Sequence, residues 1–160
     1  MFLILPGMLS KEEKKQLRLE FWERFHAIST RNRIKDHKDP KWIMNDTGIR
    51  QLKLKFHFDE KIAIAGIDVE TRNMDKRIDI FGKLERLKSK LENALGEALI
   101  WELEYPLPSG KSVSRAYLKL EKVNIYDKND WEKVIRFLYD KMTVIEKIFI
   151  EYKDYLKYSE

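Results

Sequence analysis

Cysteine is absent from all 160 residues of this chain. Disulfide bonds and thiolate metal sites are therefore excluded, and a reducing compartment suits such a chain. Histidine is also rare, and the three residues present, His26, His37 and His57, show no pairing at metal-ligand spacing. Any metal chemistry would have to use carboxylate oxygens, the ligands that Mg²⁺ prefers.

Long apolar runs are lacking as well, and no stretch approaches the roughly 20 apolar residues of a membrane-spanning helix. The apolar start, residues 1–5, has no basic region before it and is shorter than the apolar core of a signal peptide. We therefore expect a soluble cytoplasmic protein with no membrane partner. We expect residues 1–9 to be disordered, with Met8 as an alternative start, because the first helix signal comes at Ser10.

Glycine and proline number only 6 and 4, and the chain has no Gly-rich phosphate loop, nucleophile-elbow serine or low-complexity linker. Hydrophobic residues make up 43% of the chain and aromatic residues 12%, which is enough for a core. We therefore predict one domain over residues 1–160. Charged residues reach 37%, but their signs are mixed and the net charge is only +5. This balance permits a nucleic-acid partner without favouring one.

Alternation of apolar and polar residues predicts four strands. The clearest pair lies between Leu52 and Glu70, and its second strand is apolar on both faces, which is typical of a central strand. Gly66 interrupts that strand and indicates either a bulge or a close approach of another backbone. Two more strands are expected over residues 99–105 and 114–120, joined by a turn at 106–111.

Helical spacing predicts three helices around these strands. Ser10 and Glu13 form a capping-box pattern that opens the first helix, and its periodicity stops where a basic loop is expected, at residues 29–41. A second helix is expected from Asn73 to Gly96. A third, opened by Asn129 and continuous to residue 156, would be about 40 Å long, so that its end, with Tyr152, Tyr155 and Tyr158, would project or pack on another chain. The predicted fold is α+β: a four-stranded, mostly antiparallel sheet in α-β-β-α-β-β-α order, with helices mainly on one face.

Asp68 and Glu70 form the best candidate for a chemical site. They are two residues apart on a strand and so share a face, and with Glu102 from a neighbouring strand they could hold Mg²⁺. Metal-dependent nucleases of the restriction type also need a Glu-x-Lys pair on the next strand, and none falls on a predicted strand. Capping of a turn toward Arg72 is the structural alternative. We therefore predict no catalytic residue and no cofactor. Mg²⁺ is expected only if the chain is a metal-dependent nuclease.

The polar face of the predicted sheet is the second candidate, as a binding surface. It would carry Lys53, Lys55, His57, Glu102, Glu104, Arg115, Tyr117 and Lys119. Such a face is either a solvated ladder of ion pairs, with Arg115 on Glu102 or Glu104, or a platform on which Tyr117 stacks and the cations meet phosphates. The basic loop with Arg31 and Arg33 is a further nucleic-acid candidate, diluted by Asp36 and Asp39.

Six short segments in this order resemble a known family. They are residues 20–25 (Glu-Phe-Trp-Glu-Arg-Phe), 45–49 (Asn-Asp-Thr-Gly-Ile), 67–70 (Ile-Asp-Val-Glu), 81–85 (Phe-Gly-Lys-Leu-Glu), 109–111 with 114–115, and 129–131 (Asn-Asp-Trp). Over roughly residues 17–155 the chain resembles a family known only as domain of unknown function 4268. The resemblance implies a small bacterial or archaeal domain, alone or attached to larger proteins that sometimes carry nuclease-like parts. It implies no established activity and no catalytic residues.

Two functions follow from these observations. The first is a non-enzymatic interaction module that binds a macromolecular partner or associates with itself. The alternative is a divergent metal-dependent nuclease or a nucleic-acid-binding domain. They differ at Asp68 and Glu70, because an enzyme needs these carboxylates in a cleft with a third ligand and a lysine, whereas a module leaves them capped, paired or solvated.

Overall fold

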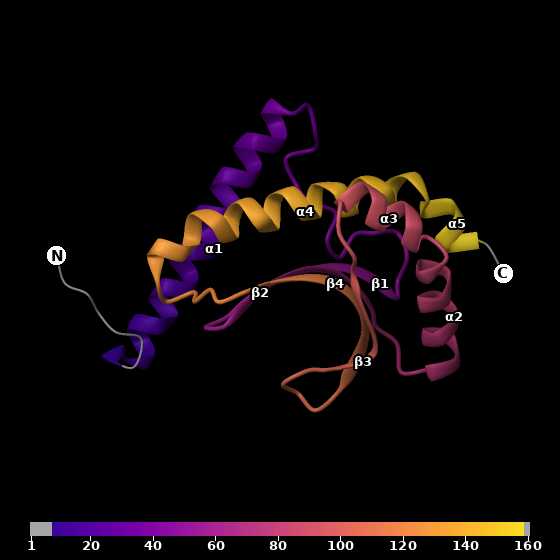
Figure 1. Cartoon of the computed structure of the whole chain (residues 1–160), viewed down its shortest axis with the longest axis horizontal. Helices are drawn as coiled ribbons and strands as arrows, with labels where there is room; N and C mark the ends of the chain where they lie inside the picture. The colour runs from indigo at the N-terminus through magenta and orange to yellow at the C-terminus, as the bar shows by residue number, and fades with distance from the viewer. Residues whose placement is uncertain (1–7, 159–160) are drawn as a thin grey trace.

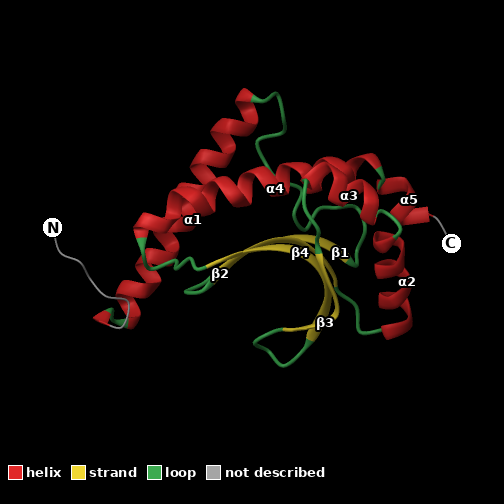
Figure 2. Ribbon diagram, viewed as in Figure 1, coloured by secondary structure: helices red, strands yellow, loops and turns green. Residues whose placement is uncertain are grey.

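Four strands pair into one antiparallel sheet in the order β1-β2-β4-β3 (Figures 1 and 2). The strands are β1 (Leu52–Phe58), β2 (Ile62–Val69), β3 (Ile100–Pro106) and β4 (Ser112–Glu121). The computed structural model describes residues 8–158, so most of the segment predicted to be disordered lies outside the described residues. The predicted α+β fold and its element order are confirmed, and β2 is buried along nearly its whole length, as its apolar pattern predicted.

Helices cover one face of this sheet (Figure 2). They are α1 (Lys11–Lys35), α2 (Met74–Glu85), α3 (Lys88–Leu95), α4 (Trp131–Glu151) and α5 (Lys153–Tyr158), with a short 3-10 turn at Lys128–Asp130 before α4. Phe21 of α1 packs edge-on against Phe58 of β1 and Trp131 of α4, with ring centroids 4.8 and 5.4 Å apart. This aromatic cluster joins both long helices to the sheet, and burial of such rings dominates the energy of a core. Within residues 8–158, no helix is long and apolar enough to cross a membrane.

The helices differ from the prediction in four places. The first helix does not stop at residue 29 but continues to Lys35. Its last two turns lack an apolar stripe because Arg33, not a hydrophobic residue, is buried there. The second helix is divided at Arg86 and Leu87 into α2 and α3.

The third helix begins at Trp131 and ends at Glu151, so it does not reach Leu156 in one piece. The chain turns at Tyr152, and α5 returns to bury Leu156. Tyr152 and Tyr155 therefore pack against the core, while Tyr158 is exposed. The predicted cap at Asn129 is also wrong, because the side chain of Asp127 accepts from the Asn129 amide to start the 3-10 turn.

Gly66 sits where β2 and β4 come unusually close. The pairing of β2 is continuous with both neighbours, so the strand has no bulge. A Cβ atom on Gly66 would lie 2.7 Å from Cβ of Tyr117 and 2.8 Å from the Ala116 carbonyl oxygen. The close approach is therefore confirmed. It lies in a sheet that bends so that the face without helices is concave (Figure 2), and glycines in strands commonly permit such curvature.

Candidate functional site

The side of the sheet without helices, hereafter the concave face, is defined by the strand registers. Side chains that share it belong to Lys53, Lys55, His57, Ile64, Asp68, Glu102, Tyr105, Val113, Arg115, Tyr117 and Lys119. Every predicted strand residue of the binding surface except Glu104 is therefore on one face. Glu104 lies at an irregularity of β3, between Glu102 and Tyr105, where the pairing with β4 shifts.

That irregularity also moves Tyr105. Strict alternation along the strand would place Tyr105 on the same face as Leu99, Trp101 and Leu103. The register shift instead pairs Tyr105 with Val113 and places it on the concave face. Its ring meets that of Tyr117 edge-on at 5.4 Å. A β-bulge leaves no reliable mark in a sequence pattern, which is why this residue was not among the candidates.

Asp68 and Arg115 form a buried ion pair at the centre of the concave face. They are direct cross-strand neighbours, and Nε and Nη2 of Arg115 donate to the two carboxylate oxygens at 2.7 and 2.9 Å. Asp68 is 1% exposed and Arg115 7%. The guanidinium also lies 4.1 Å from the centre of the Tyr105 ring. Burial disfavours the charge on Arg115, but the Asp68 carboxylate outweighs this effect and raises the pKa of Arg115.

This pair decides what the predicted acidic set can do. Both oxygens of Asp68 are occupied by Arg115, whereas Glu70 lies beside Lys53 and Lys55, at 3.0 and 3.7 Å. Among residues 8–158, no three His, Asp or Glu side chains are grouped so that they could hold a metal ion. The predicted alternatives, a turn cap toward Arg72 and a pairing of Arg115 with Glu102 or Glu104, give way to the Asp68–Arg115 pair.

The other basic side chains of the concave face are paired as well. His57 lies 2.8 Å from Asp59, and Lys119 lies 3.2 Å from Glu121. Burial opposes ionisation of Asp59, but hydrogen bonds from His57 and from the Ile62 and Lys61 amides hold its pKa below the usual range. With Lys53 and Lys55 on Glu70, each basic residue predicted for this face has a carboxylate partner. A phosphate backbone would have to displace these carboxylates.

Tyr117 is covered rather than available for stacking. Its side chain is 4% exposed, with Cβ against Gly66 and the ring against Tyr105. Ile64 and Val113 are also buried on the same face. The concave face therefore buries apolar side chains of its own on both sides of the Asp68–Arg115 pair.

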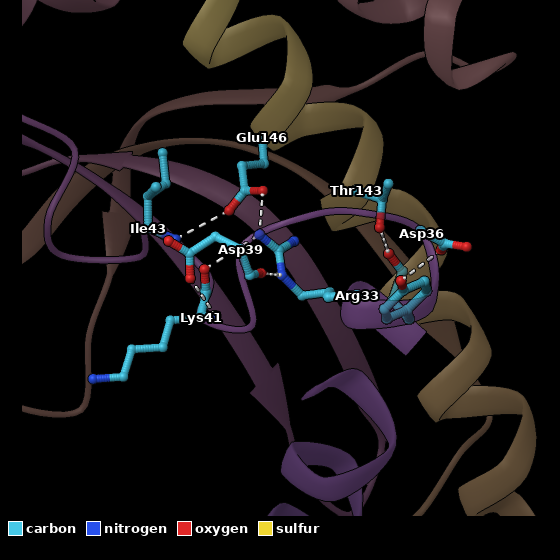
Figure 3. A network of polar contacts seen from close by, with 8 residues as sticks. Arg33, Asp36, Asp39, Lys41, Ile43, Thr143 and Glu146 are labelled. Atoms are coloured by element: carbon cyan, nitrogen blue, oxygen red, sulfur yellow. Dashed lines mark hydrogen bonds and ion pairs between the residues drawn. The ribbon is translucent and has the colours of Figure 1, made fainter. Parts of the chain in front are cut away.

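The two arginines predicted for the basic loop lie instead on the last turns of α1. Arg31 is exposed, but Arg33 is 2% exposed, and its Nη2 lies 2.9 Å from Glu146 of α4 (Figure 3). Arg33 also donates to the carbonyl oxygens of Asp39 and Lys41, at 2.7 and 3.2 Å. Arg33 therefore holds the following segment in place and does not face a ligand.

An alkaline loss of stability is expected from two tyrosines. Burial, reinforced by Glu102, raises the pKa of Tyr117 to about 12. Burial, reinforced by the hydrogen bond of its hydroxyl to Asp36 at 3.0 Å, does the same for Tyr139. The folded state therefore favours the neutral phenols, so their contribution is complete below pH ~10, the unfolded pKa, and disappears as the pH rises to about 12.

Urea unfolding between pH 9 and pH 12 measures this loss. We expect Tyr117→Phe to reduce the decline above pH 10, because phenylalanine has no phenol to ionise. The exposed Tyr158, changed to Phe, is the matched control. A Tyr117→Phe profile parallel to the wild-type profile would contradict the assignment.

Strand β3 differs from the rest of the sheet in its exposure. None of its seven residues is buried, and two apolar side chains, Ile100 and Leu103, are 37% and 40% exposed. The opposite edge of the sheet is covered over its first half, because the Leu54 and Leu52 amides of β1 donate to the carbonyls of Met44 and Ile49, both at 3.0 Å. The sheet thus has one partly covered edge and one edge open to solvent.

A groove of about 720 Å³ between α1 and α4 is a second concavity. Its lining mixes Ile28, Trp131 and Ile135 with charged side chains, and two of these, Arg24 and Arg136, are paired with Glu20 and Glu132. It contains none of the predicted site residues.

A family model described as "Domain of unknown function (DUF4268)" matches residues 17–153. No curated protein and no solved structure matches the chain. The matched range includes the whole sheet and helices α2 to α4.

Proposed function

This chain belongs to the family of the domain of unknown function DUF4268, and we propose that it is a non-enzymatic module that binds another protein along strand β3. The family brings no activity with it, so the proposal is based on the geometry of this chain. A location in the cytoplasm stays a prediction.

The open edge of the sheet is the observation that carries the proposal. An edge strand presents unpaired N–H and C=O groups, and proteins ordinarily cover or protect such edges. Here the first half of β1 is covered by the segment around Met44 and Ile49, whereas no residue of β3 is buried. Ile100 and Leu103 add apolar surface to this edge. A surface of this kind is suited to another polypeptide.

A protein partner is favoured over a nucleic acid because the basic side chains of the concave face are already paired with carboxylates. Binding of a nucleic-acid backbone depends on cations that are free to meet phosphates. The basic side chains of this face instead have carboxylate partners, and Tyr117, which would stack on a base, is buried. A nuclease is disfavoured because both oxygens of Asp68 are bonded to Arg115.

Site-specific photo-crosslinking tests the proposal. A benzophenone amino acid is placed at Leu103 on β3 or, as the matched control, at Ile150 on α4, an apolar residue that is also exposed. Irradiation in the cells of origin is expected to give discrete protein adducts from position 103 and few from position 150. Equal adducts from both positions, adducts consisting of nucleic acid, or no adducts from position 103 would contradict the proposal.

A further inference from the structure

We infer that β3 accepts an extended segment of a partner protein as a fifth strand, and that this segment carries both basic residues, lysine or arginine, and apolar residues. The inference rests on the proposed function and specifies the partner. Three features of β3 carry it: its free backbone edge, its carboxylates and its apolar surroundings.

The backbone of β3 is arranged for pairing on one side only. Its inner side bonds to β4. At the irregularity, the Leu103 carbonyl accepts from Nη2 of Arg77 at 3.1 Å and from Oγ of Ser114 at 2.6 Å, so the bulge is held in a fixed shape. Within residues 8–158, no other strand pairs with β3. An added strand would satisfy the outward peptide groups, as in β-augmentation.

The charge on this edge selects the partner. Glu102 and Glu104 take part in no ion pair among the described residues, in contrast to the acidic residues Asp68 and Glu70 farther along the concave face. Opposite charges on neighbouring strands stabilise pairing, and like charges oppose it. A strand with lysine or arginine opposite Glu102 and Glu104 therefore fits, and an acidic strand does not.

Apolar side chains near the edge complete the specificity. Ile100 and Leu103 are exposed on β3 itself. Beside it, α2 contacts β3 through Arg77 and through the ring of Phe81 on Trp101, 5.6 Å apart (Figure 1). The same helix exposes Met74 and Ile78. The register places Ile100 on the concave face with Glu102, and Leu103 and Glu104 lie together at the irregularity. A partner strand therefore meets a carboxylate and an apolar side chain at each of these two places.

A second copy of this chain fits the edge poorly. Antiparallel pairing of two β3 strands brings the glutamates of both copies to the same short edge, where like charges repel. Pairing of β3 with β1 of another copy is disfavoured, because the first half of the β1 edge is already bonded to the segment around Met44. The charge pattern therefore points to a different, basic segment.

Selection from a displayed library of random 12-residue peptides tests this inference on the whole chain. We expect enriched peptides to combine Lys or Arg with apolar residues, and Glu104→Lys to weaken the binding of a selected peptide at least tenfold. The Glu104→Lys protein should bind better than the wild type to a version of the same peptide that carries Glu in place of Lys. N-methylation of alternate peptide amides should abolish binding, because it removes the backbone donors that pair with β3. Binding by side-chain attraction alone would survive this change. Ile150→Lys is the matched control, and circular dichroism checks that each variant is folded.

Several results would overturn the inference. They are no enriched peptide, enriched peptides without basic residues or with acidic residues, binding unaffected by N-methylation, and dimerisation of the chain through β3 in light scattering. If these occur while position 103 still crosslinks to protein, the partner class is wrong and the proposed function survives. If position 103 also fails to crosslink, the proposed function itself is wrong.

Discussion

Replacement of Asp68 by alanine is expected to lower the free energy of unfolding by roughly 3–5 kcal/mol, because it leaves the charge of Arg115 buried without its partner. On the concave face, the guanidinium of Arg115 donates two hydrogen bonds to the Asp68 carboxylate. The neighbouring Tyr105 ring cannot replace this counter-ion. Urea unfolding followed by circular dichroism at pH 7 measures the loss.

Two further variants separate burial of charge from loss of contact. Changing both partners, Asp68→Leu with Arg115→Met, removes the stranded charge, so most of the stability is expected to return. Lys53→Met on the same face breaks a half-exposed pair with Glu70 and should cost at most about 1 kcal/mol. If Asp68→Ala costs no more than Lys53→Met, the buried pair does not stabilise the fold as described.

The strands could be predicted well because a half-buried strand has a strict period of two. Leu52, Leu54 and Phe58 do face the helices, and the apolar β2 is central. The partner of Arg115 was missed because alternation gives the face of a residue but not the register between strands that are distant in sequence. Asp68 and Arg115 are 47 residues apart, and only the pairing of β2 with β4 brings them together. The position of Tyr105 was missed for the related reason that one extra residue in a strand reverses every later side chain.

The end of α1 shows a different limit. Helix prediction from periodicity detects apolar stripes, and here the buried position is an arginine. Arg33 can be buried only because Glu146 lies opposite it in space, and nothing near Arg33 in the sequence shows this. From the sequence, an arginine in a basic, loop-like segment therefore suggests a nucleic-acid contact. In the structure, Arg33 instead fixes the chain between α1 and β1.

Replacement of Glu146 by alanine is the second change with a large expected effect, again roughly 3–5 kcal/mol of unfolding free energy. It leaves Arg33 buried without its carboxylate and removes the acceptor for the Ile43 amide, which donates to the other oxygen of Glu146 at 3.0 Å (Figure 3). One side chain thus joins α4 to α1 and to the segment that leads into β1. Glu132→Ala on the same helix breaks an exposed pair with Arg136 and is the matched control, with an expected cost below about 1 kcal/mol.

Hydrogen exchange distinguishes this role from a general loss of stability. Because Glu146 holds residues 36–43, its removal should raise amide exchange there and in the last turns of α1 before the sheet is affected. Glu146→Gln keeps an acceptor for Ile43 but not the charge, so we expect it to retain protection at Ile43 while losing much of the stability that pairing with Arg33 provides. If Glu146→Ala instead accelerates amide exchange uniformly across β2 and β4, the ion pair supports the whole core. The segment from Asp36 to Ile43 then has no separate dependence on Glu146.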